Sequence, residues 1–131
     1  MKKTTEEWLA KAAEDLLAAE LLLSQWELTN IVAFHAQQTV EKAFKAAIEE
    51  LELGLIRTHS LTRLYQLIES EFPVVDDPDM LDRLDAVYIE ARYPSELGLI
   101  PSGKPTSEEA AAFHAFATRV LKQIQTALTQ R

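Results

Sequence analysis

The 131-residue sequence has no cysteine, only three glycines and only five prolines. The absence of cysteine excludes disulfides, thiolate metal sites and a cysteine nucleophile. Because alanine, leucine and glutamate dominate while glycine and proline are scarce, the composition favours helix over sheet. No apolar run reaches the roughly 18 residues needed to span a bilayer, so we expect no membrane partner.

Basic residues are outnumbered, since 13 Lys and Arg stand against 21 Asp and Glu, giving a formal net charge of −8. Non-specific binding to nucleic acid depends on neutralising phosphates, so this charge argues against it but leaves room for a local basic site. Familiar catalytic templates are missing too, including a Gly-rich phosphate loop and a Gly-x-Ser-x-Gly elbow. The histidines, His35, His59 and His114, have no metal-ligand spacing, and we therefore expect neither a metal nor a cofactor.

The length fits a single domain, residues 1–131, and 47% apolar with 26% charged residues is typical of a globular fold. The first residues, Met-Lys-Lys-Thr-Thr-Glu-Glu, lead into an amphipathic helix pattern rather than into the apolar core of a signal peptide. We therefore expect a cytoplasmic protein.

Apolar residues recur with a helical period along most of the chain, and no segment is convincing as a strand. Helices are predicted over about residues 5–23, 30–53, 61–72, 78–92 and 107–128. Most connections are short, which favours antiparallel neighbours. The expected fold class is all-α, an antiparallel up-and-down bundle of four long helices plus one shorter helix.

Residues at the helix ends support these boundaries. The predicted N-terminal caps are Thr4 with Glu7, Thr29 or Asn30, Thr58 or Ser60, Asp77 before Pro78, and Thr106 with Glu109. Gly54 is predicted to end the second helix. Tyr93 should be extended because it precedes Pro94, and residues 95–105 are predicted to form a loop.

The second predicted helix carries a polar stripe among apolar neighbours. At about 100° per residue, one face of this helix holds His35, Gln38, Lys42 and Lys45, with Glu41 at its edge. One interpretation pairs Glu41 with Lys45 at i, i+4 and leaves the rest solvated. In the other, these groups line a groove or a subunit interface. Gln37 falls on the apolar stripe, so we expect its amide to hydrogen-bond a loop backbone inside the core.

Two further features allow both a structural and a functional interpretation. Leu17 and Leu21 lie opposite the apolar face of the first helix, and they either widen the core contact or help to bury a partner subunit. Arg92 ends the fourth helix and either satisfies its carbonyls and dipole or, beside Tyr93 and the loop, holds a phosphate or a carboxylate.

Three short motifs together carry a family resemblance. Along the chain they are Phe34-His35-Ala36-Gln37-Gln38-x-x-Glu41-Lys42-Ala43-x-Lys45, Thr58-His59-x-Leu61 and Ala91-Arg92-Tyr93-Pro94. In this order and spacing the chain resembles the HEPN domain (higher eukaryotes and prokaryotes nucleotide-binding) from Trp8 to about Leu128. The resemblance implies a four- or five-helix bundle and commonly a homodimer. It also implies that small stand-alone members often accompany a minimal nucleotidyltransferase in a toxin–antitoxin-like module.

The resemblance also implies a possible ribonuclease motif, from which this sequence departs. Many HEPN proteins are metal-independent ribonucleases in which an arginine is followed, four to six residues later, by a histidine at a dimer cleft. Arg92 is the only candidate for that arginine, yet residues 96–99 read Glu-Leu-Gly-Leu and the next histidine is His114. The proton-transfer partner for 2′-hydroxyl cleavage is thus missing at the expected place. His35 or His114 replaces it only if the fold brings one of them near Arg92.

The first functional hypothesis is a non-catalytic or weakly active HEPN protein that binds a nucleotide or a nucleotidyltransferase partner. Its expected binding residues are His35, Gln38, Glu41, Lys42, Lys45, Arg92 and Tyr93. One alternative is a ribonuclease toxin that cleaves RNA with Arg92 and a displaced histidine. The other is a non-catalytic dimerisation module.

Overall fold

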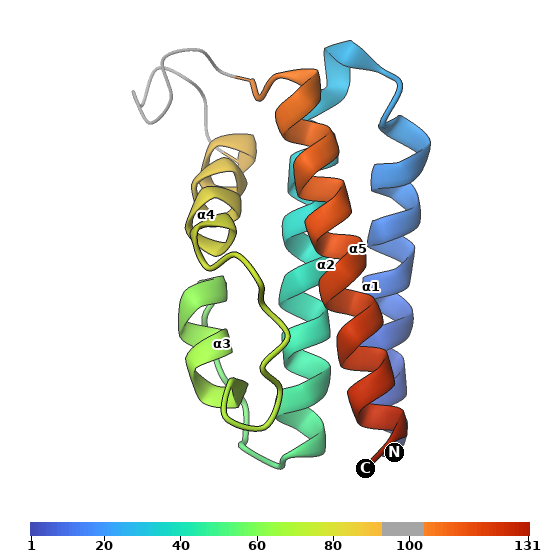
Figure 1. Cartoon of the computed structure of the whole chain (residues 1–131), viewed down its shortest axis with the longest axis vertical. Coiled ribbons are helices and arrows are strands. Elements are labelled where there is room, and N and C mark those ends of the chain that lie inside the picture. The colour runs from blue at the N-terminus through green and yellow to red at the C-terminus, as the bar shows by residue number, and fades with distance from the viewer. Residues whose placement is uncertain (93–103) are drawn as a thin grey trace.

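The computed structural model describes residues 1–92 and 104–131, with residues 90–92 described by their backbone alone. The described residues form five α-helices and one 3₁₀ turn and contain no strand (Figure 1). These elements are α1 (Lys3–Leu22), η1 (Trp26–Leu28), α2 (Thr29–Glu50), α3 (Leu61–Ile68), α4 (Asp79–Arg92) and α5 (Ser107–Thr129). The predicted fold class, an all-α up-and-down bundle of four long helices and one shorter helix, is confirmed.

The central helix of the bundle is α2, which packs against α1, α3, α4 and α5. The long helices α1, α2, α4 and α5 alternate in direction, while α3 and α4 follow one another along one side of α2 (Figure 1). Thirteen of the 22 residues of α2 are buried, against four of the 20 in α1. Polar side chains on α2 therefore face neighbouring helices rather than open solvent.

Small residues on α2 let its neighbours approach closely, and large aromatic residues fill the remaining space. The fully buried alanines of α2 are Ala33, Ala36, Ala43, Ala46 and Ala47. Phe44 is also fully buried and stacks on Tyr65 of α3, with ring centroids 5.3 Å apart. The residues of α5 that were predicted to face inward are all buried: Phe113, Ala117, Val120, Ile124 and Leu128.

The start of α1 differs from the prediction, because Thr4 and Glu7 form no capping box. The helix begins at Lys3, and no side chain caps it. Instead, the Thr4 hydroxyl donates to Glu49 Oε1 at 2.9 Å, and the Thr5 hydroxyl donates to Glu50 Oε1 at 2.8 Å. The antiparallel hairpin brings the first turn of α1 beside the last turn of α2. The two hydroxyls therefore donate to carboxylates of α2 instead of capping α1.

The predicted caps at the start of α2 were also wrong. This helix begins at Thr29 with Leu28 in the cap position and no side-chain cap. The Thr29 hydroxyl donates to the Pro105 carbonyl at 2.7 Å, and thereby connects the start of α2 to the segment that leads into α5.

Gly54 does not end α2, which stops at Glu50, four residues earlier. The left-handed residue is Glu52, with φ 56°, and the N–H of Leu53 donates back to the Ile48 carbonyl at 3.2 Å. This bond closes the usual left-handed helix ending. Gly54 adopts φ 91° in the connection that follows.

Two predicted caps are confirmed. The Ser60 hydroxyl accepts from the N–H of Arg63 at the start of α3, and Thr106 and Glu109 form a complete capping box on α5. The other start is displaced by one residue, since α4 begins at Asp79 rather than at Pro78. The predictions for Tyr93 and for most of the loop at 95–105 lie outside the described residues. None of the helices described combines the length and apolar character needed to cross a membrane.

Candidate functional site

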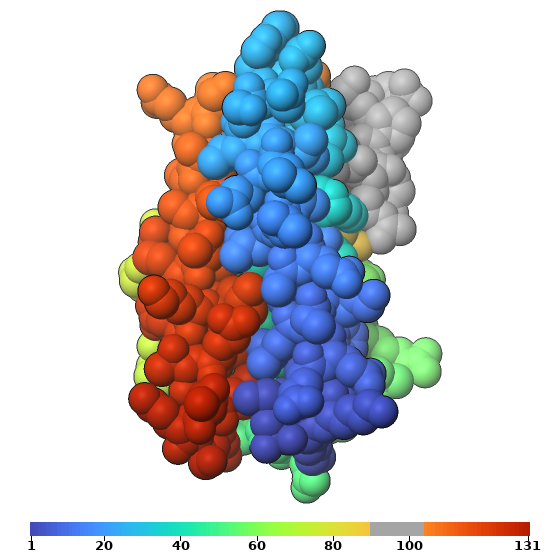
Figure 2. Space-filling view, turned by 90° about the vertical axis from the view of Figure 1, so that its right-hand side faces the viewer, coloured from blue at the N-terminus to red at the C-terminus, as the bar shows by residue number. Residues whose placement is uncertain are grey.

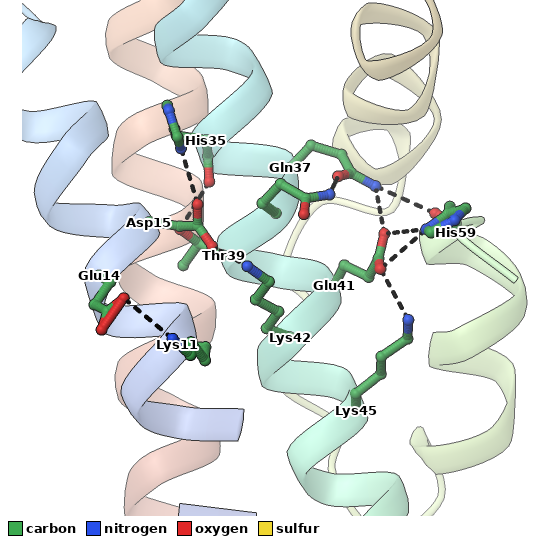
Figure 3. A network of polar contacts seen from close by, with 11 residues as sticks. Lys11, Glu14, Asp15, His35, Gln37, Thr39, Glu41, Lys42, Lys45 and His59 are labelled. Carbon is green, nitrogen blue, oxygen red and sulfur yellow. Dashed lines mark hydrogen bonds and ion pairs between the residues drawn. The ribbon is translucent and has the colours of Figure 1, made fainter. Parts of the chain in front are cut away.

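The polar stripe of α2 divides between two neighbouring surfaces. Figure 3 shows one group of side chains facing α1 and a second group facing the start of α3. Each group is centred on one carboxylate that binds both a histidine and a lysine.

The Asp15 cluster consists of Asp15 from α1 with His35 and Lys42 from α2. Asp15 Oδ1 lies 2.8 Å from His35 Nδ1, and Lys42 Nζ donates to Asp15 Oδ2 at 2.6 Å. The Asp15 side chain is 12% exposed, and those of His35 and Lys42 are 27% and 23% exposed. One carboxylate thus binds two basic groups in a partly desolvated position, where charge-assisted hydrogen bonds are strong.

The Glu41 cluster lies on the other side of α2 and is more deeply buried. The Glu41 side chain is only 4% exposed, and Lys45 Nζ donates to its Oε2 at 2.9 Å. His59 Nδ1, from the segment before α3, lies 3.1 Å from the same oxygen. The Gln37 amide donates to Glu41 Oε1 at 3.3 Å, and the Gln38 amide donates to Gln37 Oε1 at 2.8 Å.

Gln37 behaves as the sequence predicted. Its side chain is fully buried, and its amide nitrogen donates to the backbone carbonyl of His59 at 3.2 Å. This bond joins the core of the bundle to the connection between α2 and α3. The prediction of a loop-backbone partner for a glutamine on the apolar stripe is confirmed.

A row of aromatic rings connects the two clusters. His35 meets Phe34 edge to face at 5.4 Å, Phe34 stacks on Tyr88 of α4 at 5.7 Å, and Tyr88 lies 5.4 Å from His59. The row brings α2, α4 and the start of α3 together. It also makes the orientations of the two histidine rings depend on the same packed aromatic pair.

Asp85 of α4 fixes the first residue of α3. Its carboxylate oxygens accept from the N–H of Leu61 at 3.1 and 2.9 Å. Burial raises the pKa of the Asp85 carboxyl above its ordinary value, and the hydrogen bond from Leu61 limits the increase. Asp85 therefore anchors the backbone rather than providing an exposed charge.

The structure bears out one part of the first interpretation of the stripe and contradicts another part. The Glu41–Lys45 pair at i, i+4 is present, but His35 and Lys42 are bound to Asp15 rather than solvated. The Arg92 side chain and Tyr93 lie outside the described part of the chain.

The two histidines considered as replacements for the missing nuclease histidine lie in different places. Through Phe34, His35 reaches Tyr88, which precedes Arg92 in α4 by four residues. His114 is on α5, and within residues 1–89 and 104–131 no hydrogen bond, ion pair or ring contact joins its imidazole to α4. Of the two, His35 is therefore the one that ring contacts connect to α4 within the described side chains.

Two residues of these clusters, Asp15 and His59, were given no binding role from the sequence. Asp15 and His35 are equally distant in sequence from Gln25, in the turn between α1 and α2, but this spacing alone does not show how α1 lies along α2. His59 stands in the second family motif, Thr58-His59-x-Leu61, which was the available signal. Each residue contacts a charged cluster from a different element: Asp15 of α1 binds His35 and Lys42 of α2, and His59 before α3 binds Glu41 of α2.

The basic groups of the two clusters are already paired, since each basic side chain on the stripe contacts a carboxylate of the same chain. Within the described residues, no group of three His, Asp or Glu side chains could hold a metal ion. The arrangement can position imidazoles and lysines accurately. It does not present an unneutralised basic group to a ligand.

The fold and its polar central helix define an all-α bundle with two carboxylate-centred clusters. The HEPN domain family matches residues 5–126, and the chain belongs to this family. Its fold is similar to that in the crystal structure of TT1696 from Thermus thermophilus, with a TM-score of 0.79 and 24% sequence identity. The similarity covers 96% of this chain and 99% of that chain, and at this identity it shows the fold alone. A comparison with curated proteins gives no match.

Proposed function

We propose that this HEPN protein is the non-catalytic component of a two-component module, and that it binds a nucleotidyltransferase partner through an apolar surface. This α1–η1 surface consists of Leu17, Leu21, Trp26 and Leu28. Their exposed fractions are 54%, 70%, 73% and 38%, and this exposure is the observation that carries the proposal.

The α1–η1 surface concentrates large apolar side chains within twelve consecutive residues. Exposed apolar groups of this kind mark protein–protein contacts when they gather in one place, because their burial contributes about 25 cal/mol per Å². A tryptophan such as Trp26 is also among the commonest anchors of protein interfaces. This end of the molecule is therefore suited to a protein partner.

The polar clusters favour a protein partner over a nucleotide. A nucleotide phosphate would have to draw Lys45 from Glu41, or Lys42 and His35 from Asp15. Drawing these cations away would leave a largely buried carboxylate without its partner, which opposes binding of the phosphate. The net charge of −8 adds a general repulsion of polyanions. We therefore assign the clusters to fixing α1, α2 and α3 relative to one another.

Co-purification of the tagged protein with a minimal nucleotidyltransferase from the same genome tests the proposal. The wild type should form a stoichiometric complex on size exclusion, and Leu21→Glu should abolish it by placing a charge in the buried centre of the contact. Leu67→Glu is the matched control, because Leu67 of α3 is 44% exposed and lies outside the α1–η1 surface. An unbound wild type, or a Leu21→Glu variant that binds normally, contradicts the proposal.

Two further measurements separate the other hypotheses. Sedimentation of the protein alone shows whether the α1–η1 surface pairs two copies, as a dimerisation module requires. In that case Leu21→Glu should give a monomer. For the ribonuclease hypothesis, purified wild type and Arg92→Ala are incubated with RNA. For a non-catalytic component we expect equal background cleavage by both proteins.

A further inference from the structure

A second surface, distant from the α1–η1 end, contains a hollow of about 320 Å³. Its walls include Trp8, Lys45, Ile48, Glu49, Leu55 and Ile56. It lies where the first turns of α1 meet the end of α2 and the segment that follows. Figure 2 shows these turns of α1, in dark blue, on the molecular surface beside that segment, in green. The volume is within the range of ligand-binding clefts, about 300–1,000 Å³.

The walls of this Trp8 hollow are mainly apolar. Ile48 is buried beneath it, Trp8 and Ile56 are half-buried, and Leu55 remains 78% exposed at its edge. An occupant that covered Leu55 and filled the hollow would remove the apolar surface of Leu55 and Ile56 from water. The occupant must therefore carry an aliphatic group.

The charges in the walls leave an excess of negative charge. The Lys45 ammonium binds Glu41 at 2.9 Å and also lies 5.5 Å from the Trp8 ring centroid. Glu49 accepts a hydrogen bond from the uncharged hydroxyl of Thr4 at 2.9 Å. Among the described side chains, no Lys, Arg or His forms an ion pair with Glu49. The nearby Lys2 ammonium interacts with Glu49 through its charge, but it forms its ion pair with Glu52, at 2.7 Å. The carboxylates at this edge therefore outnumber the cations that neutralise them.

A neighbouring hollow repeats this pattern. Its volume is about 290 Å³, and it is lined by Thr4, Glu7, Trp8 and Lys11. Lys11 forms an ion pair with Glu14 at 3.7 Å, while Glu7 has no ion-pair partner within the part of the chain that the structure describes. Trp8 lines both hollows, and each hollow also contains a carboxylate, Glu49 or Glu7, that forms no ion pair within the described residues. Such an aromatic ring attracts a Lys or Arg side chain.

We propose that Trp8, Glu7 and Glu49 form a docking site for a basic and apolar segment of a partner polypeptide. A leucine-like side chain of the segment fills the Trp8 hollow. An adjacent Arg or Lys lies over Trp8 and pairs with Glu7 or Glu49. Charge complementarity selects this occupant, and the site is separate from the α1–η1 surface and independent of its function.

The test follows the fluorescence of Trp8 in a Trp26→Phe background, where Trp8 is the sole tryptophan. The probes are two capped peptides, Gly-Leu-Arg-Leu-Arg-Gly and Gly-Leu-Glu-Leu-Glu-Gly. The Trp8 emission should change with the concentration of the arginine peptide until it saturates, and the affinity should fall as the salt concentration is raised. The glutamate peptide should not bind. Equal binding of both peptides, or no change with either at millimolar concentration, overturns the proposal.

Variants identify the carboxylates responsible. Glu49→Gln and Glu7→Gln should each lower the affinity for the arginine peptide about two- to fivefold, as expected for the loss of a partly exposed ion pair. Glu20→Gln is the matched control on the same helix and should bind like the background protein. Urea unfolding curves show that each variant is folded. Unchanged affinity in both Glu49→Gln and Glu7→Gln overturns the assignment.

Discussion

Replacing Glu41 by glutamine tests whether the Glu41 cluster holds the start of α3 against α2. The variant keeps the shape of the side chain and removes the charge that binds Lys45 and His59. A hydrogen bond to a charged group contributes about 1.5–3 kcal/mol. Lys45 is 19% exposed and His59 is 59% exposed, so both regain part of their hydration, while Gln37 keeps its bond to the His59 carbonyl. We therefore expect a loss of about 2 kcal/mol in the free energy of unfolding.

Urea unfolding followed by circular dichroism measures this loss. A chain of this length should also show a fall in Tm of about 6–10 °C for 2 kcal/mol. Glu14→Gln is the matched control, because Glu14 pairs with Lys11 while both side chains are at least 65% exposed. The control should lose less than about 0.5 kcal/mol. A loss in Glu41→Gln no larger than in the control would refute the assigned role.

Two further predictions concern other parts of the bundle. Thr106→Ala should lower the free energy of unfolding by about 1 kcal/mol, because it removes the capping box of α5. Thr4→Ala removes no cap and should lower it by less. Equal losses for the two variants in urea unfolding would contradict this difference. Burial raises the folded pKa of the Asp85 carboxyl, so its charge opposes folding most at neutral pH and less as the pH falls through that pKa. As the pH is lowered, the free energy of unfolding of the wild type should therefore rise relative to that of Asp85→Asn. A difference between the two proteins that does not change with pH would contradict this prediction.

Features encoded within one helix were accessible from the sequence. The helical period placed Phe113 and Ile124 in the core, and the short spacing of Thr106 and Glu109 predicted their capping box. Gln37 was also predictable, because an amide on an apolar stripe has to find a partner inside the core. Each of these inferences needs only local geometry and the cost of burying a polar group.

Features set by the register between helices were not accessible. The hydroxyls of Thr4 and Thr29 looked like caps, but distant acceptors that the fold brings close bind them instead. The ion pairs of Asp15 with His35 and Lys42 likewise depend on how α1 lies along α2. Periodicity identifies the face on which a residue lies, and it does not identify the residue opposite.

The central claim is that a protein partner binds the α1–η1 surface and not the polar clusters of α2. Hydrogen exchange of this protein, alone and with the nucleotidyltransferase, tests it most directly. We predict added protection across residues 17–28, and little change in the segment at residues 58–61 beside the Glu41 cluster. Protection that appears at residues 58–61 and leaves residues 17–28 unchanged would contradict it.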